Sequence, residues 1–222
     1  MVKYKFLSHK IEKYMPSYGK IDRVWTRRTK SIQKGDSCNT FEIRIPNHIG
    51  THVDAPAHFF ESALKISDFS ARECIFNDPY ILNCSLKNNE LLDIRHLKNI
   101  PKKKIDILLF KTNFQKFRGQ DVYFLNNPGI SYEVPLWLKK NFPSIKAIGI
   151  DFVSISCFKR RKTLQGVYAH RAFLNPKSSR SILIIEDMDL SGKLQNLKQV
   201  IISPFRFTEI DSSFCTIIGI FK

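Results

Sequence analysis

Short apolar runs recur along the chain and are rich in isoleucine, phenylalanine and valine. Runs of this length, with many β-branched and aromatic residues, predict β-strands. Two of them, Ile105–Phe110 and Ile182–Ile185, are nearly continuous apolar stretches, which is typical of strands buried on both faces of a sheet. The predicted strands are Thr40–Pro46, Pro79–Cys84, Ile105–Lys111, Ala147–Phe152, Ser181–Glu186, Gln199–Ile202 and Cys215–Phe221.

Helical patterns are fewer than strand patterns. The best lies at Tyr132–Phe142, where apolar residues are flanked by lysines and Pro143 follows. Weaker helical patterns lie at Leu91–Lys98 and Ala169–Leu174. Because strands outnumber helices and the two alternate only in part, we predict an α/β or α+β fold with a mixed sheet. A single domain spanning residues 1–222 accommodates these elements.

The chain is strongly basic. It has 36 lysines and arginines against 20 aspartates and glutamates, a formal net charge of +16. Such an excess can attract an anionic partner such as nucleic acid. The basic clusters at Arg27–Arg28, Lys102–Lys104 and Lys159–Lys162 are, however, short and not interleaved with aromatic residues that would stack on bases. We therefore expect no nucleic-acid partner and attribute the charge to a lysine-rich composition.

Two further features concern the compartment. No stretch approaches the ~20 apolar residues of a membrane span, and the first residues lack the apolar core and cleavage site of a signal peptide. The five cysteines form no Cys-x-x-Cys pair, and an odd, scattered set indicates free thiols in a reducing compartment. We therefore expect a cytoplasmic protein that does not associate with a membrane.

Three of the six histidines lie close together, at residues 48–58. The prolines and the glycine in this segment disfavour a helix, so we predict a strand. Side chains alternate between the two faces of a strand, so His48, His52 and Asp54 point one way around Gly50. The intervening residues are apolar or β-branched and suit a buried face.

Two imidazoles and one carboxylate on one strand face form a candidate metal site. These donors suit zinc, manganese or iron(II), and three of them leave a coordination position open for water. The alternative is a strand whose polar residues simply face solvent, but the apolar character of the opposite face disfavours it. Pro56 ends the strand and brings His58 round on a turn, where it can act as an acid or base.

From His48 to His58 the sequence reads His-x-Gly-Thr-His-x-Asp-x-Pro-x-His, which resembles the signature of the metal-dependent cyclase family. This family includes bacterial kynurenine formamidases and isatin hydrolases. Flanking matches follow in the family's order along nearly the whole chain: Leu7–His9 with Met15-Pro16, Gly149–Asp151 with Ser154, His170–Leu174, Ile184–Glu186 and Ser203–Phe207.

The resemblance implies a swivelling β/β/α fold, a homodimer and two divalent metals, with zinc expected and manganese as the alternative. It implies that His48, His52 and Asp54 bind the first metal and that Asp54 bridges to the second. His170 and Glu186 would complete the ligands of the second metal.

The resemblance also assigns two roles outside the ligand set. His58 would transfer protons, and Tyr18 would stand against the ring of an aromatic substrate. Asp187, directly after Glu186, is the nearest competitor for that ligand position. His9 and His96 receive no role, and for them we expect an ordinary core or surface position.

Together these features predict an enzyme that hydrolyses a carbon–nitrogen bond in a small molecule. A bound metal would ionise water near neutral pH, and His58 would protonate the departing nitrogen. The resemblance favours an amide, formamide or lactam, with N-formylkynurenine of tryptophan catabolism as the first candidate. Two alternatives stay open: a cyclase or dehydratase acting on a polyketide-like or other carbonyl substrate, and a basic binding protein with a structural metal, which normally has four protein ligands.

Overall fold

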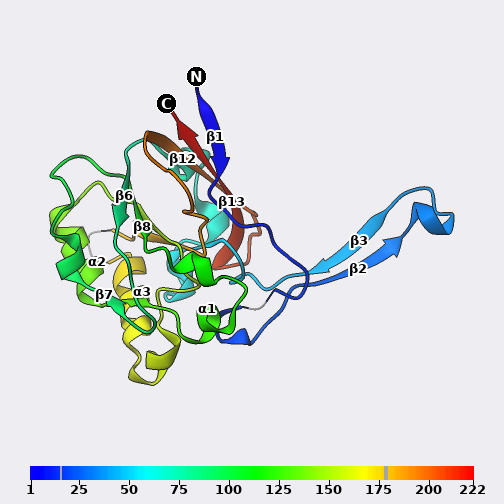
Figure 1. Ribbon diagram of the computed structural model, residues 1–222, viewed down its shortest axis with the longest axis horizontal. Helices are drawn as coiled ribbons and strands as arrows, with labels where there is room; N and C mark the ends of the chain where they lie inside the picture. Colours follow the sequence, from blue (N-terminus) through cyan, green and yellow to red (C-terminus); the bar gives the residue numbers. More distant parts are fainter. Residues whose placement is uncertain (16, 178–179) are drawn as a thin grey trace.

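One large mixed sheet organises the protein in this computed structural model, which describes residues 1–15, 17–177 and 180–222 (Figure 1). Pro16, part of the opening motif quoted above, lies outside the described residues. The strands run in the order β5–β12–β13–β4–β11–β10–β8–β6, and β1 also pairs with β13. They are β1 (Lys3–Phe6), β4 (His52–Asp54), β5 (Ile75–Phe76), β6 (Pro79–Asn83), β8 (Ile107–Lys111), β10 (Ala147–Ile150), β11 (Leu183–Glu186), β12 (Leu197–Pro204) and β13 (Ser212–Phe221).

Strand β4 joins two differently built halves of the sheet. On one side, β11, β10, β8 and β6 are parallel to one another. On the other side, β13, β12 and β5 are antiparallel. β4 is antiparallel to both of its neighbours, β11 and β13, and all three of its residues are buried. The short strand that carries His52 and Asp54 therefore lies in the middle of the sheet.

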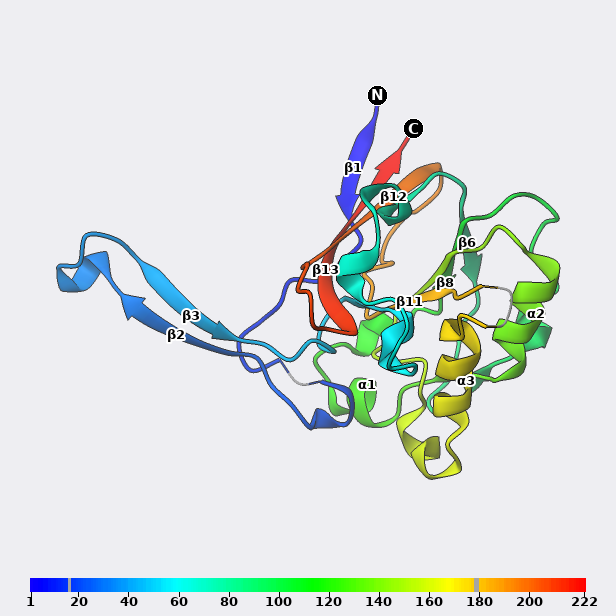
Figure 2. The same cartoon turned by 180° about the vertical axis from the view of Figure 1, so that it is seen from behind.

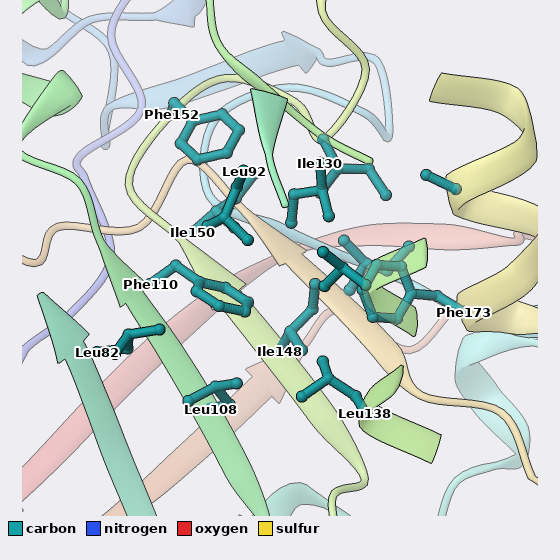
Figure 3. Packing of buried hydrophobic residues seen from close by; sticks show 14 of the residues in the cluster. Leu82, Leu92, Leu108, Phe110, Ile130, Leu138, Ile148, Ile150, Phe152 and Phe173 are labelled. Atoms are coloured by element: carbon teal, nitrogen blue, oxygen red, sulfur yellow. The ribbon is translucent and has the colours of Figure 1, made fainter. Parts of the chain in front are cut away.

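Helices α2 (Glu133–Asn141) and α3 (Gln165–Leu174) pack on one face of the parallel half (Figure 2). Figure 3 shows this cluster, in which Ile148 of β10 and Leu138 of α2 are both completely buried. Alternate residues of the same strands, such as Leu109 of β8, belong to a second cluster on the opposite face. Burial on both faces explains why these strands have nearly continuous apolar sequences.

Most of the predicted elements are present. The seven predicted strands correspond to β3 (Thr40–Arg44), β6, β8, β10, β11, β12 and β13, with shifted ends. The helices predicted at Tyr132–Phe142 and Ala169–Leu174 correspond to α2 and to the second half of α3. The mixed α+β sheet is therefore confirmed. Shorter elements that were not predicted are α1 (Asp121–Leu125) and β9 (Gly129–Ile130).

The helix predicted at Leu91–Lys98 was wrong. The segment begins with β7 (Leu91–Leu92), which pairs with β9, and continues as a 3₁₀ turn at Ile94–Leu97. The carboxylate of Asp93 accepts a hydrogen bond from the backbone N–H of Arg95 at 2.9 Å. An aspartate at this place caps a new turn and so separates the strand from it.

Strands β2 (Trp25–Lys30) and β3 form a two-stranded ribbon that extends away from the main sheet (Figures 1 and 2). Only β3 was predicted, because β2 is mostly basic and has no apolar alternation. On one face of the ribbon Phe41 and Ile43 are 55% and 63% exposed. We call this ribbon the arm.

Two further features concern membrane-spanning helices and the state of the cysteines. No helix among the described residues is long and apolar enough to cross a membrane. The five cysteines, all of them in the described part of the chain, are unpaired thiols, as predicted.

Candidate metal centre

The register of β4 and β11 brings three candidate ligands onto one face of the sheet. His52 and Asp54 are two residues apart on β4, and Glu186 is the direct partner of His52 on β11. The Nε2 atom of His52 lies 3.5 Å from Asp54 Oδ1 and 3.5 Å from Glu186 Oε2. The pairing of β4 with β11 therefore places the carboxylates of Asp54 and Glu186 next to the imidazole of His52.

Helix α3 adds a second imidazole from the layer above the sheet. His170 Nε2 lies 3.4 Å from Glu186 Oε1 and 3.8 Å from Asp54 Oδ2. All four side chains are buried, so the polar cluster lies inside the protein and not on its surface.

Hydrogen bonds to backbone carbonyls fix the tautomers of both buried imidazoles. His52 donates from Nδ1 to the carbonyl of Gly50, and His170 donates from Nδ1 to the carbonyl of Gly166, each at 2.8 Å. A carbonyl oxygen can only accept, so each Nδ1 carries a proton, and in the neutral ring Nε2 has the free lone pair. Histidines that bind metals are commonly oriented in this way.

Glu186 is also held in place. Its Oε1 accepts hydrogen bonds from the backbone N–H of Ile155 at 2.7 Å and from the hydroxyl of Ser154 at 3.1 Å. Ser154 belongs to the central motif recognised in the sequence. That motif therefore positions the carboxylate that follows it in the sheet.

The donors fit a divalent metal. His52 Nε2 and both carboxylate oxygens of Asp54 are buried yet have no hydrogen-bond partner among the described residues. Leaving such groups unsatisfied costs about 1–3 kcal/mol each, and more when they are charged. The 3.4–3.5 Å spacings around Glu186 match the separation of ~3.4 Å between tetrahedral ligands with bonds of ~2.1 Å. A cation at this place would satisfy these three atoms.

His48 reaches the same cluster by a different path from the one predicted. Only His52–Asp54 form a strand, because Gly50 has φ of +66° and turns the chain just before it. The predicted strand was therefore wrong for residues 48–51, and Ile49 packs in a separate small cluster with Met15. His48 Nδ1 still lies 3.1 Å from Asp54 Oδ1, so the predicted convergence of the side chains is present.

His58 lies on a 3₁₀ turn at Pro56–His58, as the proline predicts. Its ring lies against that of His48, with centroids 4.2 Å apart and the ring planes tilted by 39°. Candidate ligand atoms lie within 4.8 Å of one another in two triads, His48–Asp54–His58 and His52–Asp54–Glu186. The second triad combines residues from the two three-ligand sets expected from the resemblance, and the first brings His58 close enough to compete as a ligand.

Sequence reasoning missed Asp211. Its Oδ2 atom lies 2.6 Å from His58 Nδ1 and 3.1 Å from His48 Nε2. It precedes β13, whose first residue pairs with Asp54 in the sheet. No local pattern marks this aspartate in the sequence, because its place beside the histidines depends on the pairing of β13 with β4.

Opposite charges outweigh burial at three groups of the cluster. Burial would raise the pKa of Asp54, but the imidazoles of His48 and His52 hold it well below its usual range. Burial would lower the pKa of His48, but its contacts with Asp211 and Asp54 raise it to about 10. The pKa of His170 is likewise raised, because the carboxylate of Glu186 outweighs the effect of burial.

Asp187 does not compete with Glu186. Its carboxylate accepts hydrogen bonds from Arg118 at 3.0 Å and from the hydroxyl of Tyr123 at 2.5 Å. Asp187 has φ of +52°, so the chain turns after the strand and the two consecutive carboxylates diverge. Its role is a buried ion pair beside the centre.

Aromatic side chains lie beside the cluster. Phe59 lies against His170 with centroids 5.3 Å apart, and against His58 at 4.6 Å. Tyr18 is half-buried and meets Phe158 edge-on at 5.4 Å. Burial chiefly, and the nearby carboxylate of Glu186 in smaller measure, raise the pKa of Tyr18 above its usual value. The predicted role of Tyr18 against a substrate ring stays a prediction.

His9 and His96 lie outside the cluster. His96 belongs to the turn after β7, where its ring accepts a hydrogen bond from the backbone N–H of Asp93 at 3.1 Å. His9 is half-buried, and its backbone N–H donates to the hydroxyl of Thr51 at 2.9 Å. Both positions agree with the ordinary structural roles expected for them.

Comparisons with known proteins agree with this architecture. A family model described as "Putative cyclase" matches residues 6–156. Cyclase-like protein 2 of Oryza sativa subsp. japonica is 26% identical over 215 residues, covering 93% of this chain and 75% of that protein. Isatin hydrolase A from Labrenzia aggregata superimposes with a TM-score of 0.79 at 17% identity, over 99% of this chain and 94% of that one. A predicted metal-dependent hydrolase from Bacillus stearothermophilus gives a TM-score of 0.72 at 19% identity, over 99% and 98% of the two chains. The chain belongs to the cyclase family and has the fold of its metal-dependent hydrolases.

Proposed function

We propose that this protein is a metal-dependent hydrolase that cleaves a carbon–nitrogen bond in a small amide, formamide or lactam. Arylformamidase activity, the conversion of N-formylkynurenine to kynurenine and formate, is the first candidate. The observation that carries the proposal is the buried, unpartnered donor set of His52 and Asp54 facing Glu186 and His170. The fold shared with isatin hydrolase A supports the same class of reaction.

His48, His52 and Asp54 would hold a first divalent metal, and His170 and Glu186 would hold a second with Asp54. Oδ1 of Asp54 faces His48 and His52, whereas Oδ2 faces His170, which supports a bridging carboxylate. We expect zinc, with manganese as the alternative. When bound, such metals polarise a carbonyl group and lower the pKa of water to near neutrality.

The remaining residues of the site supply orientation and a proton. His58 lies at the edge of the cluster, half-buried, where its ring can protonate a departing nitrogen. Phe59 and Tyr18 offer flat apolar faces beside it, which favour an aryl substrate over a sugar or a charged peptide. Burial of the inner ligands keeps bulk water away from the carboxylates.

The test is a substrate screen on protein of measured metal content. The panel contains N-formylkynurenine, simple formanilides, isatin and an aliphatic lactam, each with apoprotein as the control. We expect hydrolysis of an aryl formamide or lactam that disappears on chelation and returns with zinc or manganese. Turnover of a polyketide-like carbonyl substrate alone would favour the cyclase or dehydratase alternative, and tightly held metal without any turnover would favour a structural role.

We also infer that the protein forms a homodimer through the arm. A two-stranded ribbon is at best marginally stable by itself, and this one exposes Phe41 and Ile43 on the same face. A second copy is the partner that the resemblance suggests. Light scattering on the wild type and on the double variant Phe41→Ser, Ile43→Ser is the test. We expect a dimer and a monomer respectively, and a monomeric wild type would contradict the inference.

A further inference from the structure

Asp211 contacts both histidines that are not buried in the core of the cluster. Its Oδ2 lies 2.6 Å from His58 Nδ1 and 3.1 Å from His48 Nε2, and its Oδ1 accepts a hydrogen bond from the side-chain amide of Asn47 at 2.8 Å. Its backbone carbonyl accepts from the N–H of Ala55 at 2.9 Å. The carboxylate is therefore fixed from both ends between the sheet and the histidine segment.

These contacts determine which nitrogen of each ring is available. A carboxylate oxygen can only accept, so His58 donates its proton from Nδ1 and keeps Nε2 free. By the same reasoning His48 keeps a proton on Nε2 for Asp211, and its Nδ1, 3.1 Å from Asp54, is the nitrogen that must lose its proton to bind a metal. In the metal-bound protein one carboxylate oxygen would thus give opposite tautomers to the two neighbouring rings, with Nε2 of His58 free and Nδ1 of His48 available as a ligand.

We propose that Asp211 is a positioning residue that fixes the tautomer and orientation of His58 for proton transfer, and of His48 for metal binding through Nδ1. The proton-transfer role of His58 rests on the proposed function. The tautomers of the two rings do not depend on any substrate. Without Asp211 the two rings would lose their common anchor and could rotate on their loop and turn.

The kinetic test combines Asp211→Ala with His58→Ala in the zinc-loaded enzyme. Removal of an orienting partner at a metal site typically costs about 10–100-fold. We expect Asp211→Ala to lower kcat by about this factor while KM changes less than about threefold, because ground-state binding is kept. Asp211→Asn keeps one acceptor oxygen and should fall between the wild type and Asp211→Ala. In the His58→Ala background, Asp211→Ala should lower kcat by less than about threefold, because the two residues act together.

The spectroscopic test needs no substrate. Long-range ¹H–¹⁵N spectra of the zinc-loaded protein in mildly alkaline solution should show His58 protonated at Nδ1, with its signals assigned by their loss in His58→Ala. In Asp211→Ala the same ring should become a mixture of tautomers. Wild-type His58 protonated at Nε2 would overturn the proposal, even if the chain had no hydrolase activity at all.

The matched control is Glu209→Gln, which removes a carboxylate two residues away whose side chain is 86% exposed and is paired only loosely with Lys65. It should leave kcat, zinc content and the His58 spectrum unchanged. Three results would contradict the proposal: an Asp211→Ala variant with wild-type kcat, a full additive loss in the His58→Ala background, or an Asp211→Ala variant that no longer binds zinc at all. The last result would indicate that Asp211 is needed for zinc binding itself and is not a residue that only positions the two imidazole rings.

Discussion

His52 and Glu186 lie directly opposite each other on β4 and β11, with Nε2 and Oε2 3.5 Å apart. This pairing depends on the register of the two strands. A slip of one residue would move the carboxylate to the other face of the sheet, away from the imidazole. The centre is therefore a product of sheet assembly at the junction of the parallel and antiparallel halves.

The first prediction concerns His52. Its Nε2 atom is buried, unpartnered and at ligand spacing from both carboxylates, so His52→Ala should lose bound metal and activity together. Elemental analysis of purified protein measures the metal. His96→Ala, which alters a turn outside the centre, is the control and should keep its metal. A His52→Ala variant with full metal content would refute the assignment.

His58 is the subject of the second prediction. If it only transfers protons, His58→Ala should keep its metal and lose about 10²–10⁴-fold in rate, the usual span for general acid–base catalysis. Its ring also belongs to a triad with His48 and Asp54, so a role as ligand is the competing outcome. Metal content measured alongside kcat separates the two, because a ligand variant would lose metal in parallel with its rate.

A third prediction follows from the raised pKa of His48. In the metal-free protein this pKa is about 10, because Asp211 and Asp54 outweigh the effect of burial. His48 is therefore protonated at neutral pH, and it must lose that proton to bind a metal. Metal uptake near pH 7 should release a proton, and the apparent affinity should rise about tenfold per pH unit for each proton released, up to about pH 10.

The same shift has a consequence for the stability of the metal-free protein. A raised pKa in the folded state contributes stability that is complete below the ordinary value near 6.5 and is lost as pH rises through about 10.

The proton released on metal uptake can be followed with an indicator dye in weak buffer. His48→Gln should abolish the release while leaving the fold intact, and release that persists in this variant would assign the proton to another group.

The histidine segment could be predicted from sequence because its spacing is local. His52, Asp54 and the turn at Pro56 follow from period-two alternation and from proline geometry. His48 follows them only in part, because a glycine with positive φ turns the chain, and nothing in the alternation of the side chains reveals that. His170 and Glu186 could be named only through the resemblance, since one lies on a helix and the other ends a distant strand.

Asp211 lay beyond sequence reasoning for a different reason. Its partners are 153 and 163 residues away, and the contact arises because β13 pairs with β4. A single carboxylate before a strand has no pattern of its own. The arm strand β2 was missed on similar physical grounds, because a ribbon exposed on both faces needs no apolar alternation.

The fourth prediction tests how closely α3 must approach the sheet. A Cβ atom at Gly166 would lie 2.7 Å from the backbone Cα of Ser156, and the Gly166 carbonyl orients His170. Gly166→Ala should therefore push the helix outward, lower stability by about 1–3 kcal/mol and weaken metal binding through His170. Tyr168→Ala, at an exposed position two residues later, is the control for thermal unfolding and metal content. Unchanged metal affinity in Gly166→Ala would show that His170 is not needed for it.

The last prediction concerns the substrate. In the proposed function the ring of Tyr18, which is half-buried and lies edge-on to Phe158, contacts the bound aryl group. Such a contact exists equally in the ground state and the transition state. Tyr18→Ala should therefore raise KM for an aryl formamide about 5–20-fold, an energy of about 1–2 kcal/mol for a lost aromatic contact, with a smaller effect on kcat.

Matched variants make this prediction specific to the ring. Tyr18→Phe keeps the aromatic face and should keep the wild-type KM, whereas Tyr132→Ala removes an exposed tyrosine at the start of α2 and should change neither constant. Initial rates across a range of N-formylkynurenine concentrations give both constants. If Tyr18→Ala lowers kcat and leaves KM unchanged, the ring acts in the chemical step and not in binding. If aryl formamides are inert while an aliphatic lactam is turned over, the aromatic wall does not select the substrate and the arylformamidase assignment fails.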